Sequence, residues 1–168
     1  MKIRMEKDFD YQNIREVNLC AFPSNDEALL VDKLRKSGEV ISLVAVKHDK
    51  MVGHVLFSTS TIENSNESFI ALVLAPVAVL PEFQNQGIGT KLIEIGLEEA
   101  KKRGYSMVTV MGHPKYYPSF GFKPALEYGI ESPFNVPEKA FMVLELVPGT
   151  LNHVSGVLNY SKAFNDIL

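Results

Sequence analysis

The chain has 168 residues, 46% of them hydrophobic, which is enough to bury one sizeable core and too few for two comfortable domains. We therefore expect a single domain over residues 1–168. The net charge of −3 gives no basic field to hold a phosphate backbone, so nucleic acid is not an expected partner. The lone cysteine, Cys20, excludes an intramolecular disulfide and the clustered cysteines of a zinc site. We expect no metal and a reducing, cytoplasmic location.

No segment has the pattern of a signal peptide or a membrane span. Residues 1–10 are charged and alternating, and the longest apolar run, residues 70–81, is interrupted by prolines. We expect no membrane association.

The first third of the chain predicts a strand, two helices and a hairpin. Residues 2–6 alternate as a short strand does, and Asp8 or Asp10 is placed to cap a helix that runs to Pro23. A second, short helix follows and ends at Gly38. Two β-rich runs, residues 41–47 and 51–61, are then separated by a short polar turn, which predicts a hairpin.

The middle of the chain predicts a buried strand followed by the clearest helix. Residues 69–80 are so continuously apolar that both faces of the strand are expected to be covered, with Pro76 at a bulge. Residues 87–103 have helical periodicity and Gly104 is placed to end the helix. Further strands are predicted at three places: residues 105–111, 140–147 and, as an edge strand, 154–160. This order predicts a three-layer α/β fold with a mixed, largely antiparallel sheet.

The strongest chemical signal lies between the apolar strand and the clear helix, at residues 84–90. A helix start leaves unpaired N–H groups with a partial positive charge, and glycines let the backbone approach a bulky anion. An ordinary strand-to-helix turn is the simplest alternative. A dinucleotide fingerprint requires a third glycine where Leu92 stands, and a P-loop requires GxxxxGK[ST], which is absent.

The segment VAVLPEFQNQGIGTKL resembles the acetyl-CoA-binding motif of the GNAT acetyltransferases, whose pattern Gln-x-x-Gly-x-Gly is filled by Gln84, Gly87 and Gly89. The match spans about residues 70–104. The resemblance implies a GNAT fold, with a sheet splayed at its central strands and Pro76 at the bulge. It implies that the pantetheine arm bonds to the backbone of Val77, Ala78 and Val79. It also implies that the pyrophosphate is held by Gln84, Asn85, Gln86, Gly87, Ile88, Gly89 and Thr90.

A second motif, YYPSFGF, resembles the family's short helix that ends in Tyr-x-x-x-Gly-Phe. The resemblance assigns Tyr117 as the general acid for the departing thiolate and places Phe120 beside the cofactor. A phenol has a pKa of ~10 and a thiol has a pKa of ~8.5, so full proton transfer from Tyr117 to the thiolate is uphill by ~2 kcal/mol. Hydrogen bonding to the thiolate, without proton transfer, is the competing role for Tyr117. A structural role for Tyr117 as a core aromatic is the alternative. Tyr116 is expected in packing or substrate contact.

The general base has no assignment. Many family members carry a glutamate on the central strand, whereas residues 72–79 contain no carboxylate. Asp26 and Glu27 fall in a region that the family places beside the substrate cleft, although acidic residues at a helix start also complement its dipole. Of the histidines, His113 is nearest in sequence to Tyr117.

We therefore expect an acetyl-CoA-dependent N-acetyltransferase that acts on a primary amine of a small molecule, peptide or protein. Residues 140–149 with the short tail resemble the YhbS-like bacterial branch of the family, whose members are often monomers or homodimers. A non-catalytic acyl-CoA-binding sensor or scaffold is the alternative, and a nucleotide-binding domain has less support.

Overall fold

The computed structural model describes residues 1–165, whose strands form one mixed sheet. Its main path runs in the order β1 (Lys2–Met5), β2 (Val40–Lys47), β3 (Lys50–Glu63), β4 (Ser68–Val79), β5 (Met107–Met111), β8 (Phe141–Glu145) and β6 (Lys123–Pro124). Off this path, β9 (Gly156–Asn159) pairs with β3 and with β7 (Ile130–Glu131). Within residues 1–165, only the β4–β5 and β7–β9 pairs are parallel, which confirms the mixed, largely antiparallel sheet.

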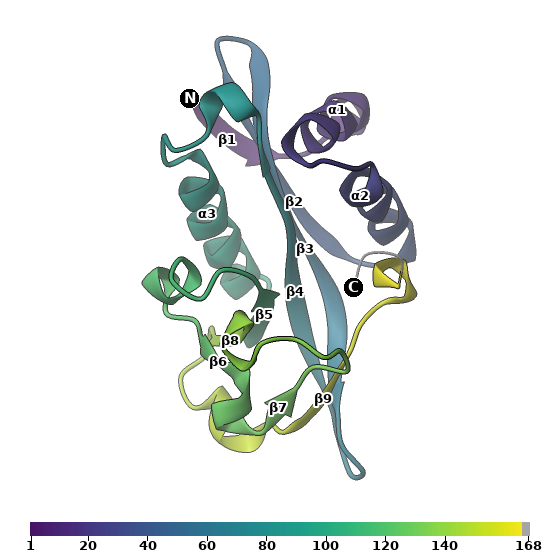
Figure 1. The fold of residues 1–168 in the computed structure, drawn as a ribbon, viewed down its shortest axis with the longest axis vertical. Helices are drawn as coiled ribbons and strands as arrows, with labels where there is room; N and C mark the ends of the chain where they lie inside the picture. Colours follow the sequence, from purple (N-terminus) through teal and green to yellow (C-terminus); the bar gives the residue numbers. More distant parts are fainter. Residues whose placement is uncertain (166–168) are drawn as a thin grey trace.

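Three helices complete the layers. Figure 1 shows α3 (Ile88–Lys102) on one side of the central strands and α1 (Tyr11–Ala21) with α2 (Asp26–Ser37) on the other. The three-layer arrangement follows from amphipathic helices burying their apolar faces against a sheet that is itself buried on both sides.

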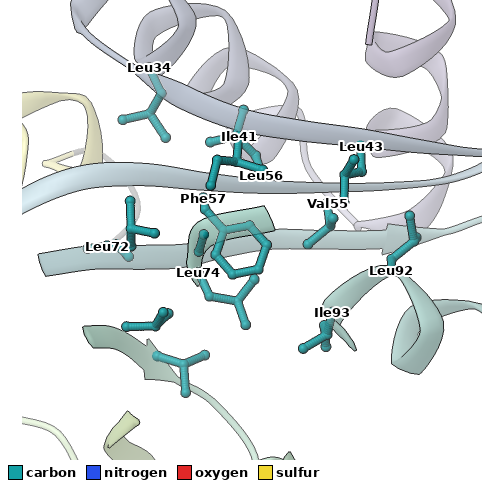
Figure 2. Packing of buried hydrophobic residues seen from close by; sticks show 14 of the residues in the cluster. Leu34, Ile41, Leu43, Val55, Leu56, Phe57, Leu72, Leu74, Leu92 and Ile93 are labelled. Atoms are coloured by element: carbon teal, nitrogen blue, oxygen red, sulfur yellow. The ribbon is translucent and has the colours of Figure 1, made fainter. Parts of the chain in front are cut away.

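The contact between α3 and the sheet depends on a glycine. Phe57 of β3 lies in the core near Leu74 and Ile93 (Figure 2). A Cβ atom added at Gly96 of α3 would lie 2.2 Å from the Phe57 ring, so no larger residue fits without moving it. Gly96 thereby sets how closely α3 approaches β3.

The hairpin and the bulge appear where the sequence predicts them. His48 and Asp49, the two residues between β2 and β3, both have positive φ, as a tight two-residue turn requires. On β4, Val77 pairs with Val55 whereas Leu74 pairs with Phe57, so two β4 residues, Ala75 and Pro76, face one on β3. Pro76 therefore occupies a bulge, where its missing N–H does not break the ladder.

Several expectations about the elements are wrong in detail. Asp10 stands at the N-cap of α1, but its carboxylate accepts hydrogen bonds from Arg4 and from the Lys7 amide and does not cap the helix. The second helix has 12 residues and is not short. The short helix of the second motif, by contrast, is confirmed as a single 3₁₀ turn, Tyr117–Phe120, followed by Gly121. The strand near residue 156 is not at an edge, since it has a partner on each side.

Candidate active site

The sheet opens between β4 and β5. These strands pair only at Leu72 with Val108 and at Val73 with Thr109. Beyond this point β4 continues to Val79, still paired with β3 on its other edge. One edge of β4 from Leu74 onward therefore has no strand partner among residues 1–165, and this is the splay that the sequence predicted at the central strands.

The loop after β4 presents the start of α3 to this opening. Gly87, the N-cap of α3, is left-handed with φ 83° and has no side chain to cap the helix. Asn85 is also left-handed, with φ 62°. The first turn of α3 contains no acidic residue. The first N–H groups of a 15-residue helix are thus uncapped and free to meet an anion.

A groove of about 310 Å³ lies in front of this helix start. It collects most of the residues that the sequence assigned to the cofactor, together with two that it did not. Its lining consists of Val77, Val79, Phe83, Gln84, Asn85, Gly87, Ile88, Gly89, Thr90 and Tyr116. A Cβ atom at Gly89 would point between Val77 and Val79 at 3.7 Å from each. Gly89 thus keeps the groove open.

Of the residues assigned in this segment, Ala78 and Gln86 lie outside the groove lining, and Gln84 lines it while also bracing the loop. The Ala78 side chain is buried, and its residue pairs with His54 of β3. The Gln84 side chain donates to the Val79 carbonyl at 3.0 Å, so it braces the loop against β4. The Gln86 side chain donates to the Glu82 carbonyl at 3.4 Å and is absent from the groove lining. These glutamines therefore shape the loop.

Tyr116 lines the groove, although the sequence assigned it to packing or substrate contact and not to the cofactor. Its hydroxyl lies 2.7 Å from the Thr90 hydroxyl in the first turn of α3. Its ring packs edge-on against Tyr117 and Phe120. The adjacent pair Tyr116–Tyr117 alone does not say which ring faces the groove. The structure turns Tyr116 toward α3 and Tyr117 toward β5.

Tyr117 is held against the end of β5 by a glycine. A Cβ atom at Gly112 would lie 2.3 Å from the Tyr117 ring, so only glycine leaves room for it. Phe122 packs edge-on against the same ring, with ring centroids 5.8 Å apart. Burial raises the pKa of the Tyr117 hydroxyl to about 12. The phenol therefore stays protonated at neutral pH and is a hydrogen-bond donor.

The remaining candidates lie apart from the groove. Phe120 contacts the rings of Tyr116 and Tyr117 but does not line the groove. Asp26 and Glu27 begin α2, and burial raises the pKa of the Glu27 carboxyl. His113 is exposed and its Nδ1 accepts a hydrogen bond from the Lys115 amide.

Residues 1–165 contain no cluster of three potential metal-ligating side chains, and none of their helices is long and apolar enough to cross a membrane.

Comparisons with known proteins agree with this fold. Residues 38–124 match the family model of the acetyltransferase (GNAT) domain. The uncharacterized N-acetyltransferase YjhQ of Escherichia coli K12 is 40% identical over 134 residues, 77% of this chain and 74% of that protein. The uncharacterized N-acetyltransferase YhbS of E. coli K12 is 32% identical over 167 residues, which cover 98% of this chain and 99% of YhbS.

Two solved structures resemble the fold over nearly the whole chain. The crystal structure of E. coli YhbS in complex with CoA superposes with a TM-score of 0.91, covering 98% of this chain and 91% of that one at 32% identity. A GNAT family acetyltransferase from Brucella melitensis in complex with acetyl-CoA has a TM-score of 0.78, with 97% of each chain covered at 31% identity. The family model, the two relatives and these folds lead to one conclusion: the chain belongs to the GNAT family of N-acetyltransferases and is an acyltransferase.

Proposed function

We propose that residues 1–168 form a single N-acetyltransferase domain that transfers an acetyl group directly from acetyl-CoA to a primary amine. The observation that carries this proposal is the uncapped start of α3, which opens into a groove beside the unpaired edge of β4. CoA is bound by the solved relatives YhbS and, as acetyl-CoA, by the Brucella protein. To bind the same type of ligand, this chain requires a site for the diphosphate and an unpaired strand edge for the amide-containing pantetheine arm.

The groove offers both features. The diphosphate is proposed to lie on the amides of Gly87 to Thr90, where the helix dipole favours negative charge. The pantetheine arm is proposed to run along Val77 to Val79, with its amides bonded to the free edge of β4 as an added strand would be. Tyr116 and Thr90 then stand at the side of the groove, with hydroxyls available to the phosphates or the arm.

Tyr117 is proposed to act on the leaving sulfur. The neutral amine attacks the thioester carbonyl, the C–S bond breaks, and the thiolate leaves with the electron pair while the new amide nitrogen loses a proton. The Tyr117 pKa of about 12 lies roughly 3.5 units above the pKa of a thiol, ~8.5, so full proton donation to the thiolate costs on the order of 5 kcal/mol. We therefore assign Tyr117 as a hydrogen-bond donor that stabilises the thiolate until solvent protonates it.

The acceptor site and the general base are proposed at the carboxylates that begin α2. Asp26 and Glu27 begin α2, which lies on the face of the sheet opposite α3 (Figure 1). The acceptor is proposed to approach the splay from this face. The raised pKa of Glu27 makes its carboxylate a better proton acceptor than an exposed glutamate. Small amines and peptide α-amines are the first acceptors to test, because an α-amine with a pKa of ~8 is deprotonated more readily than a lysine side chain at ~10.4.

The function is tested by following free thiol with acetyl-CoA and a panel of amines and peptides. We expect amine-dependent thiol release, a fall of at least tenfold in kcat for Tyr117→Phe, and little change in the Kd for CoA. Tyr128→Phe, a half-buried tyrosine away from the groove, is the matched control and should retain full activity. Wild-type turnover in Tyr117→Phe would remove its role.

A non-catalytic acyl-CoA-binding module is the second candidate. It is favoured by the absence of a carboxylate in residues 72–79 of β4. It predicts tight CoA binding with no amine that accelerates thiol release. Amine-dependent release would exclude it.

A further inference from the structure

A second cavity, of about 880 Å³, lies at the opposite end of α3 from the loop that follows β4. It is bordered by Arg103 and Tyr105, just past the last turn of α3, and by Ile70 near the start of β4. With 15 residues at ~1.5 Å each, α3 separates this cavity from the loop by about 22 Å. The paired part of β4 and β5, at Leu72 and Val73, lies between the cavity and the splay. The volume is in the range of small-molecule sites.

The cavity lies at an interruption in the sheet. Both β2 and β9 pair with the same edge of β3: Val40 opposes Ser58, and Asn159 opposes Thr61. Between these pairs, Thr59 and Ser60 have ladder partners on β4 but none on the β2–β9 side among residues 1–165; only the Ser60 hydroxyl reaches across, donating to the Asn159 carbonyl at 2.6 Å. Backbone groups at an unpaired edge require another hydrogen-bonding partner. A ligand with an amide group can supply it.

The walls of the cavity include apolar surface that the fold leaves uncovered. Ile70 is 63% exposed, although the next four residues of β4, 71–74, are all at most 4% exposed. The side chains of Tyr105 and Tyr160 contribute to the same lining. An apolar group of a ligand can pack here, with aromatic rings beside it.

The exposed side chain of Lys162 completes the lining. Arg103 is already engaged by Glu99 at 3.1 Å, by the carbonyl of Val40 at 3.2 Å and by Glu39, a carboxylate of the same lining, at 3.8 Å. Among residues 1–165, by contrast, the Lys162 ammonium makes no ion pair or hydrogen bond. An ammonium forms charge-assisted hydrogen bonds with a carboxylate, and an organic acid can place its apolar part on the neighbouring apolar surface.

We propose that this cavity is a second small-molecule site, which binds an organic acid that carries an amide and an apolar side chain, such as an N-acylated apolar amino acid. Its carboxylate pairs with Lys162, its amide bonds to the open edge of β3 between Ser58 and Thr61, and its side chain packs on Ile70. Occupation of this site leaves the cofactor groove free, since the two lie at opposite ends of α3.

The probe is N-acetylphenylalanine, titrated into the ¹⁵N-labelled full chain with and without saturating CoA. We expect saturable shifts of the amides of Thr59, Ser60 and Tyr105, with the same Kd in both titrations. N-acetylphenylalanine methyl ester, which has no carboxylate, should bind at least about fivefold more weakly.

Variants separate the proposed contacts from non-specific binding. Lys162→Met should weaken binding of the acid at least about fivefold and leave binding of the ester unchanged. Lys123→Met, at an exposed lysine outside the cavity, should bind the acid like wild type. The proposal is overturned by an absence of shifts at millimolar acid, by equal affinities for acid and ester, or by shifts at residues 84–90 that CoA abolishes. None of these readouts depends on acetyl transfer.

Discussion

The Tyr116 hydroxyl lies 2.7 Å from the Thr90 hydroxyl, so the segment after β5 is hydrogen-bonded to the first turn of α3 beside the cofactor groove. The Tyr116→Phe variant retains the ring and its edge contacts but loses this hydroxyl. We expect the Kd for CoA to rise about three- to tenfold, the loss of one hydrogen bond to a charged or polar ligand. Isothermal titration of the variant, with Tyr128→Phe as control, measures this. An unchanged Kd would mean that the hydroxyl serves only the contact with Thr90.

Gly89 offers a test of the groove that does not disturb the fold. An added Cβ would sit at ordinary van der Waals distance from Val77 and Val79, inside the groove. We expect Gly89→Ala to raise the Kd for CoA at least about tenfold, with a melting temperature equal to or slightly above that of wild type. Gly38→Ala, at an extended position outside the groove, is the control. Wild-type affinity in Gly89→Ala would place the cofactor elsewhere.

Gly112 tests the position of Tyr117. The methyl group of Gly112→Ala would overlap the Tyr117 ring, so the ring must move away from β5. We expect kcat to fall about as far as in Tyr117→Phe, with CoA affinity within about twofold of wild type and a loss of stability of about 1–3 kcal/mol from overpacking. Steady-state kinetics and denaturant unfolding give the two quantities. Full turnover in this variant would contradict the assigned position of Tyr117.

A buried histidine predicts how stability depends on pH. His54 of β3 has Nε2 2.9 Å from Ser42 Oγ and Nδ1 3.2 Å from Asn18 Nδ2. Since the Ser42 hydroxyl donates to Glu6 at 2.6 Å, it accepts from Nε2, and Nδ1 accepts from Asn18. This assigns the neutral tautomer with the proton on Nε2. Burial lowers the pKa of His54 to about 3, with Glu6 opposing the shift and Arg35 adding to it.

The direction in which pH changes the folding stability follows from these pKa values. Unfolded His54 takes up a proton below pH ~6.5 and folded His54 does not, so acid favours the unfolded chain. We expect the free energy of unfolding to fall by up to about 1.4 kcal/mol per pH unit between pH 6 and 5. The lowered pKa values of Glu6 and Asp10 add their effect only near and below ~pH 4.5. In His54→Gln this slope should be smaller by about that amount; an equal slope in both proteins would refute the assignment.

The parts of the fold that the sequence predicts depend on local patterns. Three such patterns each involve residues close together in the chain: the helical periodicity of residues 88–102, the apolar run of β4, and the glycines at 87 and 89. The structure has a helix, a strand and a helix start at these positions. Pro76 indicated the bulge because proline lacks the N–H that a regular ladder requires.

The parts that the sequence did not predict depend on partners distant in the chain. Asp10 binds Arg4 of β1, and no pattern around Asp10 distinguishes this from a helix cap. Tyr116 is hydrogen-bonded to Thr90, which is 26 residues away in the chain. The sequence around two adjacent tyrosines does not indicate which of the two rings faces the groove. Pro118 and Gly121 confine the second motif to a single 3₁₀ turn, which only the structure revealed.

The most direct test is a titration of the ¹⁵N-labelled protein with CoA and, separately, with pantetheine, which has no diphosphate. The account predicts that CoA binds much more tightly than pantetheine and that the amides of Gly87, Gly89 and Thr90 show the largest shifts. Equal affinities for the two ligands, or undisturbed amides at the start of α3 with CoA bound, would contradict it.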